Sequence, residues 1–88
     1  MRSAILRKNE GMKTKVFLFG MLADIVNQST IEIEDVKDTD MLLKKVRELN
    51  GAFIDATFLM AVNNKIVLVN QLLKDNDEVA LLPPYAGG

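Results

Sequence analysis

Residues 58–69 read FLMAVNNKIVLV, and this segment decides how the rest of the chain can fold. Residues 58–62 and 65–69 are two short apolar runs, rich in side chains that favour strands. The two asparagines between them, Asn63 and Asn64, tolerate the positive φ angles that a two-residue hairpin demands. The segment is therefore predicted to be a β-hairpin.

Three further strands are predicted on either side of the hairpin. Residues 78–82 form an apolar run that must end at Pro83 and Pro84, because proline cannot donate to the ladder of a sheet. Residues 13–19 end in VFLF and are bounded by Gly20. Residues 29–34 alternate apolar with polar side chains, which is typical of a half-exposed strand.

Two helices are predicted between these strands. The apolar side chains of residues 21–26 recur at i, i+3 and i+4, as on one face of a short helix. A longer helix begins after Asp38 or Thr39, either of which can cap it, and its apolar face holds Leu42, Leu43, Val46 and Leu49. The order is strand, short helix, strand, long helix, hairpin, strand. It predicts an α+β fold with a mixed sheet under one principal helix, the β-grasp or ubiquitin-like arrangement.

The composition narrows the chemistry that the chain can perform. Its 88 residues are 49% apolar and 26% charged, as expected for one folded, soluble domain. The absence of cysteine and histidine excludes disulfides, a thiolate nucleophile, an imidazole base and the usual transition-metal ligands. Residues 75–78 carry carboxylates but lack the length of a calcium loop, so we expect a solvated turn there and no metal.

Charge and hydropathy also exclude two kinds of partner. The net charge of −1 and the few aromatic residues do not suit a nucleic-acid binder, which should present a basic face. The longest apolar runs resemble residues 79–82 and are far too short to span a membrane, and the N-terminus lacks the apolar core of a secretory signal. We therefore expect a cytoplasmic protein that binds neither nucleic acid nor membrane.

The chain divides into three parts. Residues 1–11 carry three basic side chains and one acid and show no clear periodicity, so they are either a cloning remnant or a native, flexible arm. Residues 12–82 form the β-grasp domain. Residues 83–88, PPYAGG, form an extended C-terminal tail.

The tail is the part that suggests chemistry. Pro83 and Pro84 favour an extended path away from the sheet, and four residues span about 13 Å. Gly87 and Gly88 have no Cβ, so their backbone can pass through a narrow slot in another protein. The α-carboxylate of Gly88 is ionised and resists attack, so an enzyme using ATP would have to activate it. The alternative is that residues 83–88 are a flexible tail without function.

The tail and the predicted fold together resemble the ubiquitin-like sulfur carriers. The closest resemblance is to the small-subunit family of molybdopterin synthase, the MoaD family, and rests on DEVALLPP at residues 77–84 with Gly87 and Gly88. Supporting matches are VFLF at residues 16–19 and AVN at residues 61–63, and the Pro-Pro pair favours this family over the carrier of thiazole synthesis. The resemblance covers residues 13–88. Asn76 replaces a frequent glycine, and residues 85–86 replace a smaller, more polar pair.

The resemblance implies a cycle centred on Gly88. An ATP-dependent adenylating enzyme activates its carboxylate, and a sulfur donor converts it to a thiocarboxylate. The large subunit of molybdopterin synthase receives the tail, and two sulfur transfers to a cyclic pyranopterin precursor build the dithiolene. Gly88 is then a covalent carrier within an enzyme complex, and the chain itself binds no cofactor.

A second surface is predicted on the sheet. In several strands both the odd and the even positions are apolar, so both faces of that part of the sheet avoid water. Something other than the helix must therefore cover the outer face. By position in the family pattern, Phe19, Ile66 and Leu82 resemble the residues that dock the large subunit and the adenylating enzyme. The alternatives are that they belong to the core or form a homodimer.

Other functions remain open at this point. A carrier for thiazole, cysteine or thiolated tRNA synthesis, or a modifier attached to lysines, would share the tail and differ in its partner. A noncatalytic β-grasp binding module would carry the tail incidentally.

Overall fold

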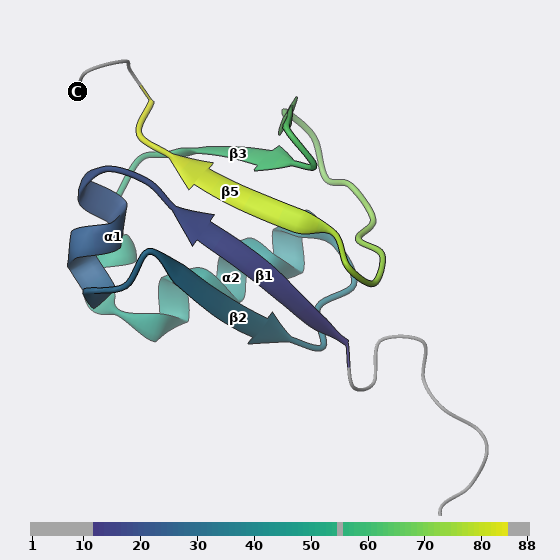
Figure 1. Cartoon of the computed structure of the whole chain (residues 1–88), viewed down its shortest axis with the longest axis horizontal. Helices are drawn as coiled ribbons and strands as arrows, with labels where there is room; N and C mark the ends of the chain where they lie inside the picture. Colours follow the sequence, from purple (N-terminus) through teal and green to yellow (C-terminus); the bar gives the residue numbers. More distant parts are fainter. Residues whose placement is uncertain (1–11, 55, 85–88) are drawn as a thin grey trace, which may run out of the picture.

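The computed structural model describes residues 12–54 and 56–84, and within them five strands form one mixed sheet (Figure 1). The predicted extension at residues 1–11 and the terminal Gly87 and Gly88 lie outside the described residues. The strands are β1 (Lys13–Leu18), β2 (Thr30–Glu34), β3 (Leu59–Val62), β4 (Lys65–Val67) and β5 (Glu78–Leu82). The helices are α1 (Met21–Val26), α2 (Thr39–Leu49) and the 3₁₀ turn η1 (Gly51–Phe53).

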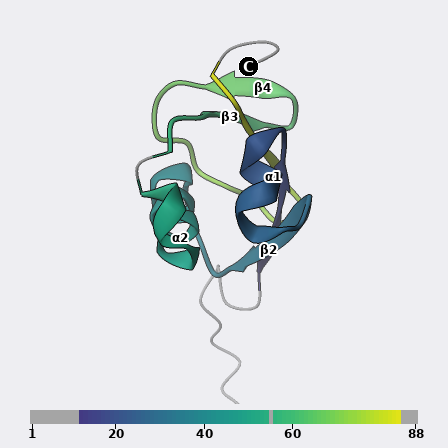
Figure 2. The ribbon, with the colours of Figure 1, turned by 90° about the vertical axis from the view of Figure 1, so that its left-hand side faces the viewer.

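The sheet has the strand order β2-β1-β5-β3-β4. β1 and β5 run parallel, and the other neighbours are antiparallel. The helix α2 lies behind the sheet in Figure 1 and is seen beside it in Figure 2. This arrangement confirms the predicted α+β, β-grasp fold. No helix in the described part of the chain is long and apolar enough to cross a membrane.

The hairpin forms as predicted but is shorter than predicted. Asn63 and Asn64 adopt φ angles of 50° and 73°, as the two-residue turn requires. β4 ends at Val67, whereas the prediction extended it to residue 69. Leu68 and Val69 lie in the following loop and are 85% and 78% exposed.

The loop leaves the sheet because its backbone groups bond to the start of α2. Thr39 N donates to Gln71 O at 2.9 Å, and Leu73 N donates to Lys37 O at 2.9 Å. Asn70 Oδ1 accepts from Asp40 N at 2.8 Å and so satisfies one of the free N–H groups of the first turn. These long-range bonds take the place of continued pairing with β3.

The helix α2 is capped by Asp38, which settles the one-residue uncertainty of the prediction. Asp38 Oδ1 accepts from Met41 N at 2.8 Å. Leu42 and Val46 are fully buried against the inner face of the sheet, the face that α2 covers, and Phe53 of η1 closes the same core.

Arg47 holds the segment that follows α2. Its Nη1 donates to the carbonyl oxygens of Phe53, Ile54 and Ala56, with distances of 3.1 Å to Ile54 O and 3.3 Å to Ala56 O. The guanidinium also lies 4.9 Å from the ring centroid of Phe58. One charged group thus satisfies three carbonyls of an irregular segment.

The turn before β5 is exposed at Asp75, Asn76 and Glu78, as predicted, but it also contains a buried carboxylate. Asp77 is only 7% exposed. Its Oδ1 accepts from Asn63 Nδ2 at 2.9 Å and its Oδ2 from Lys74 N at 2.7 Å, while Asn63 Oδ1 accepts from Glu78 N at 3.0 Å. The carboxylate is buried because it ties this turn to the hairpin turn.

Candidate functional site

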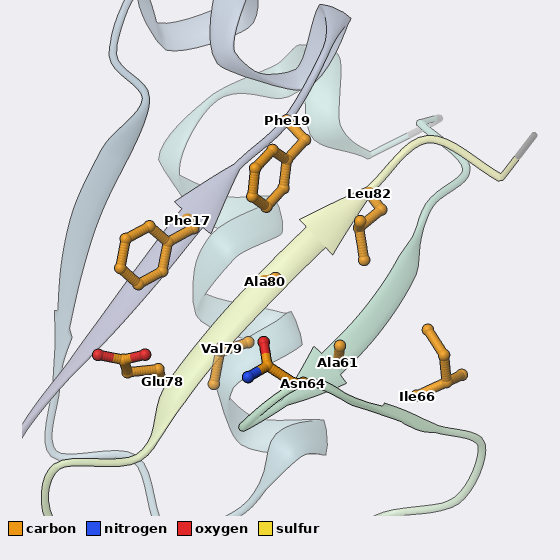
Figure 3. Close-up of a pocket in the computed structure, with 9 residues that line it drawn as sticks. All are labelled: Phe17, Phe19, Ala61, Asn64, Ile66, Glu78, Val79, Ala80 and Leu82. Atoms are coloured by element: carbon orange, nitrogen blue, oxygen red, sulfur yellow. The ribbon is translucent and has the colours of Figure 1, made fainter. Parts of the chain in front are cut away.

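The outer face of the sheet, opposite α2, carries an apolar hollow of about 410 Å³ (Figure 3). Strand register determines which side chains reach it. Ala61 pairs with both Ala80 and Ile66, so two alanines form a low floor beside a larger aliphatic side chain. The hollow is lined by Phe17, Phe19, Ala61, Asn64, Ile66, Glu78, Val79, Ala80 and Leu82.

The structure brings together the three residues that were predicted for the partner interface. Phe19 lies just beyond the end of β1, Leu82 ends β5 and Ile66 lies on the edge strand β4, and all three line the hollow (Figure 3). Phe19 is 47% exposed and Ile66 is 52% exposed, so neither belongs to the core. Their role in binding a partner stays a prediction.

The hollow lies at the point where the tail leaves the sheet. Leu82 is the last residue of β5, and Pro83 and Pro84 follow it, both half-buried. Leu81 O accepts from Phe19 N at 3.1 Å, which joins the exit to the β1–α1 turn. The apolar hollow and the base of the tail therefore share one edge of the molecule.

The other half of the outer face is charged. A shallow depression there is lined by Lys13, Lys15, Glu32, Asp75, Asn76, Asp77 and Glu78. Lys15 pairs with Glu32 on one side and with Glu78 on the other. Among the described residues no group of three or more potential ligands is placed to hold a metal ion.

Two features of the site were missed at the sequence level. Phe17 lines the hollow with Phe19, and the two-residue spacing in VFLF was a sufficient signal because alternate strand residues share a face. Gly20 was interpreted only as the end of a strand, yet it lies against Pro83. No local signal shows that contact, because the two residues are far apart in the sequence.

A β-grasp domain with an apolar hollow beside Pro83, where the chain leaves β5, has the ubiquitin-like fold. The profile of the ThiS family matches residues 16–88. The chain therefore belongs to the ThiS family, the ubiquitin-like sulfur carriers.

Similar proteins agree with this family. A molybdopterin synthase sulfur carrier subunit of Chlamydomonas reinhardtii is 34% identical over 83 residues, covering 88% of this chain and 100% of that protein. One of Dictyostelium discoideum is 30% identical over 81 residues, covering 84% and 94%. The solved complex of subunits 1 and 2 of the molybdopterin-converting factor of Helicobacter pylori contains a similar chain, with a TM-score of 0.67 and 28% identity over 88% of this chain and 100% of that one.

Proposed function

We propose that this chain is the sulfur-carrier subunit of a molybdopterin synthase. Its curated relatives bear that name, and the family match extends to residue 88. The structural observation that carries the proposal is the adjacency of the hollow and the tail. Leu82 lines the hollow and Pro83 follows it directly, so a partner seated on the hollow lies beside the first residue of the tail.

The proposed chemistry takes place on Gly88. An ATP-dependent adenylating enzyme joins the Gly88 carboxylate to AMP and releases pyrophosphate, which turns a poor electrophile into a reactive mixed anhydride. A donor that supplies sulfur at the sulfide level then attacks the acyl carbon, and AMP leaves. The product is a thiocarboxylate. The thiocarboxylate sulfur bonds to the pterin precursor and links it to Gly88 as a thioester. Water then cleaves the acyl C–S bond, which leaves the sulfur on the pterin and restores the Gly88 carboxylate, and two such transfers complete one dithiolene.

This chemistry requires no catalytic side chain on the carrier itself. It contains no cysteine or histidine, and a covalent carrier needs neither, because the acids and bases belong to the proteins that load and unload it. ATP is consumed by the adenylating enzyme, and we propose no cofactor held by this chain. We place the cycle in the cytoplasm, where ATP is available.

We propose that the large subunit binds the hollow while the tail enters its active site. The solved Helicobacter pylori structure is a complex of subunits 1 and 2 of the molybdopterin-converting factor, which supports a partner of this kind. Four extended residues reach about 13 Å, enough to carry Gly88 from the rim of the hollow into a neighbouring protein. Phe19 and Ile66 offer exposed apolar surface for the contact.

Mass spectrometry of the intact chain tests the carrier function. The chain is produced together with its adenylating enzyme in sulfur-replete cells, and a matched sample is produced without that enzyme. We expect one oxygen to be exchanged for sulfur, located by fragmentation at Gly88, in the first sample alone. An unchanged mass in both samples would count decisively against a sulfur carrier.

A second experiment distinguishes molybdopterin synthesis from the other sulfur pathways. The thiocarboxylate form is mixed with the large subunit from the same genome and the pterin precursor, and dithiolene formation is followed. We expect the product to appear in proportion to the thiocarboxylate consumed. Stable co-purification with a thiazole or tRNA-thiolation enzyme, and no dithiolene, would assign the chain to another pathway.

A further inference from the structure

Gly20 occupies a position where any other residue would press on the ring of Pro83. It connects β1 to α1 with φ 58° and ψ −138°, a conformation that L side chains rarely adopt. A Cβ added at this residue would lie 2.9 Å from Pro83 Cγ and 3.6 Å from Pro83 Cδ. The first distance is shorter than real Cβ contacts allow, so the proline ring would have to move.

The β1–α1 turn contacts the exit of the tail on both sides of Leu82. Before it, Leu81 O accepts from Phe19 N at 3.1 Å. After it, the ring of Pro83 rests against the bare Cα of Gly20. Since proline also fixes its own φ, these two contacts determine the direction in which the chain leaves β5.

The same turn carries part of the docking face. Phe19 lines the hollow and is the residue immediately before Gly20. A partner that binds Phe19 therefore also fixes the turn that contacts Pro83. The same short turn therefore fixes both the position of the docked domain and the direction of its tail.

We propose that Gly20 is a positioning residue for the carrier reaction. It provides the seat for Pro83 that aims the tail at the active site of a protein docked on the hollow. This inference rests on the proposed carrier function, but the contact itself can be tested without it. For a fully extended tail, a tilt of about 10° at the exit moves a point about 13 Å along it by about 2 Å. A misplacement of about 1 Å can already slow a reaction by about 100-fold.

The test is a double-mutant cycle with Gly20→Ala and Pro83→Ala. Pro83→Ala removes the two ring atoms that a Cβ at residue 20 would meet. Gly51→Ala is the matched control, because an added Cβ there meets nothing within 4 Å. For each variant we would measure the melting temperature, KM for the large subunit and kcat of sulfur transfer from the thiocarboxylate form.

We expect Gly20→Ala to lower kcat at least about tenfold, because the tail is misaimed, while KM changes less than about twofold, because the hollow is intact. In the Pro83→Ala background the same substitution should change kcat much less. The melting temperature should fall by about 4–8 °C in both backgrounds from the strained φ, and further in the background that keeps the Pro83 ring, because the added Cβ also meets that ring. Gly51→Ala should match the wild type in every measurement.

Three results would overturn the inference. These are an unchanged kcat in Gly20→Ala, an equal loss of kcat in both backgrounds, and a rise of KM in place of a fall of kcat. If Gly20→Ala does not fold, Pro83→Gly decides, since it frees the tail without strain at residue 20. We then expect kcat to fall at constant KM. An unchanged kcat would refute the claim that the contact between Gly20 and Pro83 directs the tail. A wild type that never acquires sulfur refutes the carrier function instead.

Discussion

Replacing Phe19 with lysine tests whether the hollow is the docking surface. Phe19 is 47% exposed, and a Phe side chain presents about 200 Å² in all, so roughly 95 Å² would leave water when a partner covers it. At about 25 cal/mol per Å² this area stabilises the complex by about 2.4 kcal/mol. Phe19→Lys should therefore raise Kd for the large subunit about 50-fold, and more if the ammonium is trapped in the interface.

Folding should survive the same change. The buried half of Phe19 is replaced in part by the aliphatic stem of lysine, whose ammonium can reach water, so the free energy of unfolding should fall by less than about 1 kcal/mol. Calorimetric titration gives Kd, and thermal melting monitored by circular dichroism reports the fold.

Leu49→Lys is the matched control for the Phe19 substitution. Leu49 is 53% exposed at the end of α2, on the side of the molecule opposite the hollow, and the change adds the same charge. Its Kd should equal that of the wild type. Equal affinities for the two variants, or an unfolded Phe19→Lys protein, would refute the placement of the interface.

Three predictions concern the framework that holds the site. Arg47→Met should lower the free energy of unfolding in urea by about 2 kcal/mol, because the carbonyl oxygens of Ile54 and Ala56 lose this donor and that of Phe53 keeps only Ala56 N; a loss below about 0.5 kcal/mol would contradict this role. Asp77→Ala should lower the free energy of unfolding by about 2 kcal/mol in the same assay, whereas Asp75→Ala, at an exposed residue, should leave it unchanged. Equal effects would contradict the role of the Asp77 carboxylate in joining the two turns. Asn76→Gly should raise the melting temperature, with a gain of up to about 1 kcal/mol, because residue 76 has φ 72°; a lower melting temperature would show that the side chain matters more.

Local signals predicted the fold well where the determining interaction is itself local. Asn63 and Asn64 take up the positive φ angles of the hairpin, and Asp38 caps α2 within its own first turn. The loop after β4 was misassigned because Leu68 and Val69 have strand-like side chains. Their path is set by hydrogen bonds between the neighbouring residues 70–73 and the start of α2, about thirty residues away.

The same distinction applies to the site. Phe19, Ile66 and Leu82 were predicted as one surface, and the strand register does bring them to one hollow. The burial of Asp77 and the contact of Gly20 with Pro83 could not be predicted, since each depends on a partner far along the chain. Gly88 lies within the range matched by the family profile but outside the described residues, so its role as the carrier stays a prediction.

The central position of β5 has a mechanical consequence. β5 is hydrogen-bonded to β1 on one side and to β3 on the other, and Pro83 and Pro84 continue from its end (Figure 1). A force that draws the tail into another protein, or withdraws it, acts along the strand and loads both ladders in shear. Many hydrogen bonds then resist together, whereas an edge strand would peel away one bond at a time. The central position of β5 therefore favours resistance to unravelling when the domain is pulled by this end.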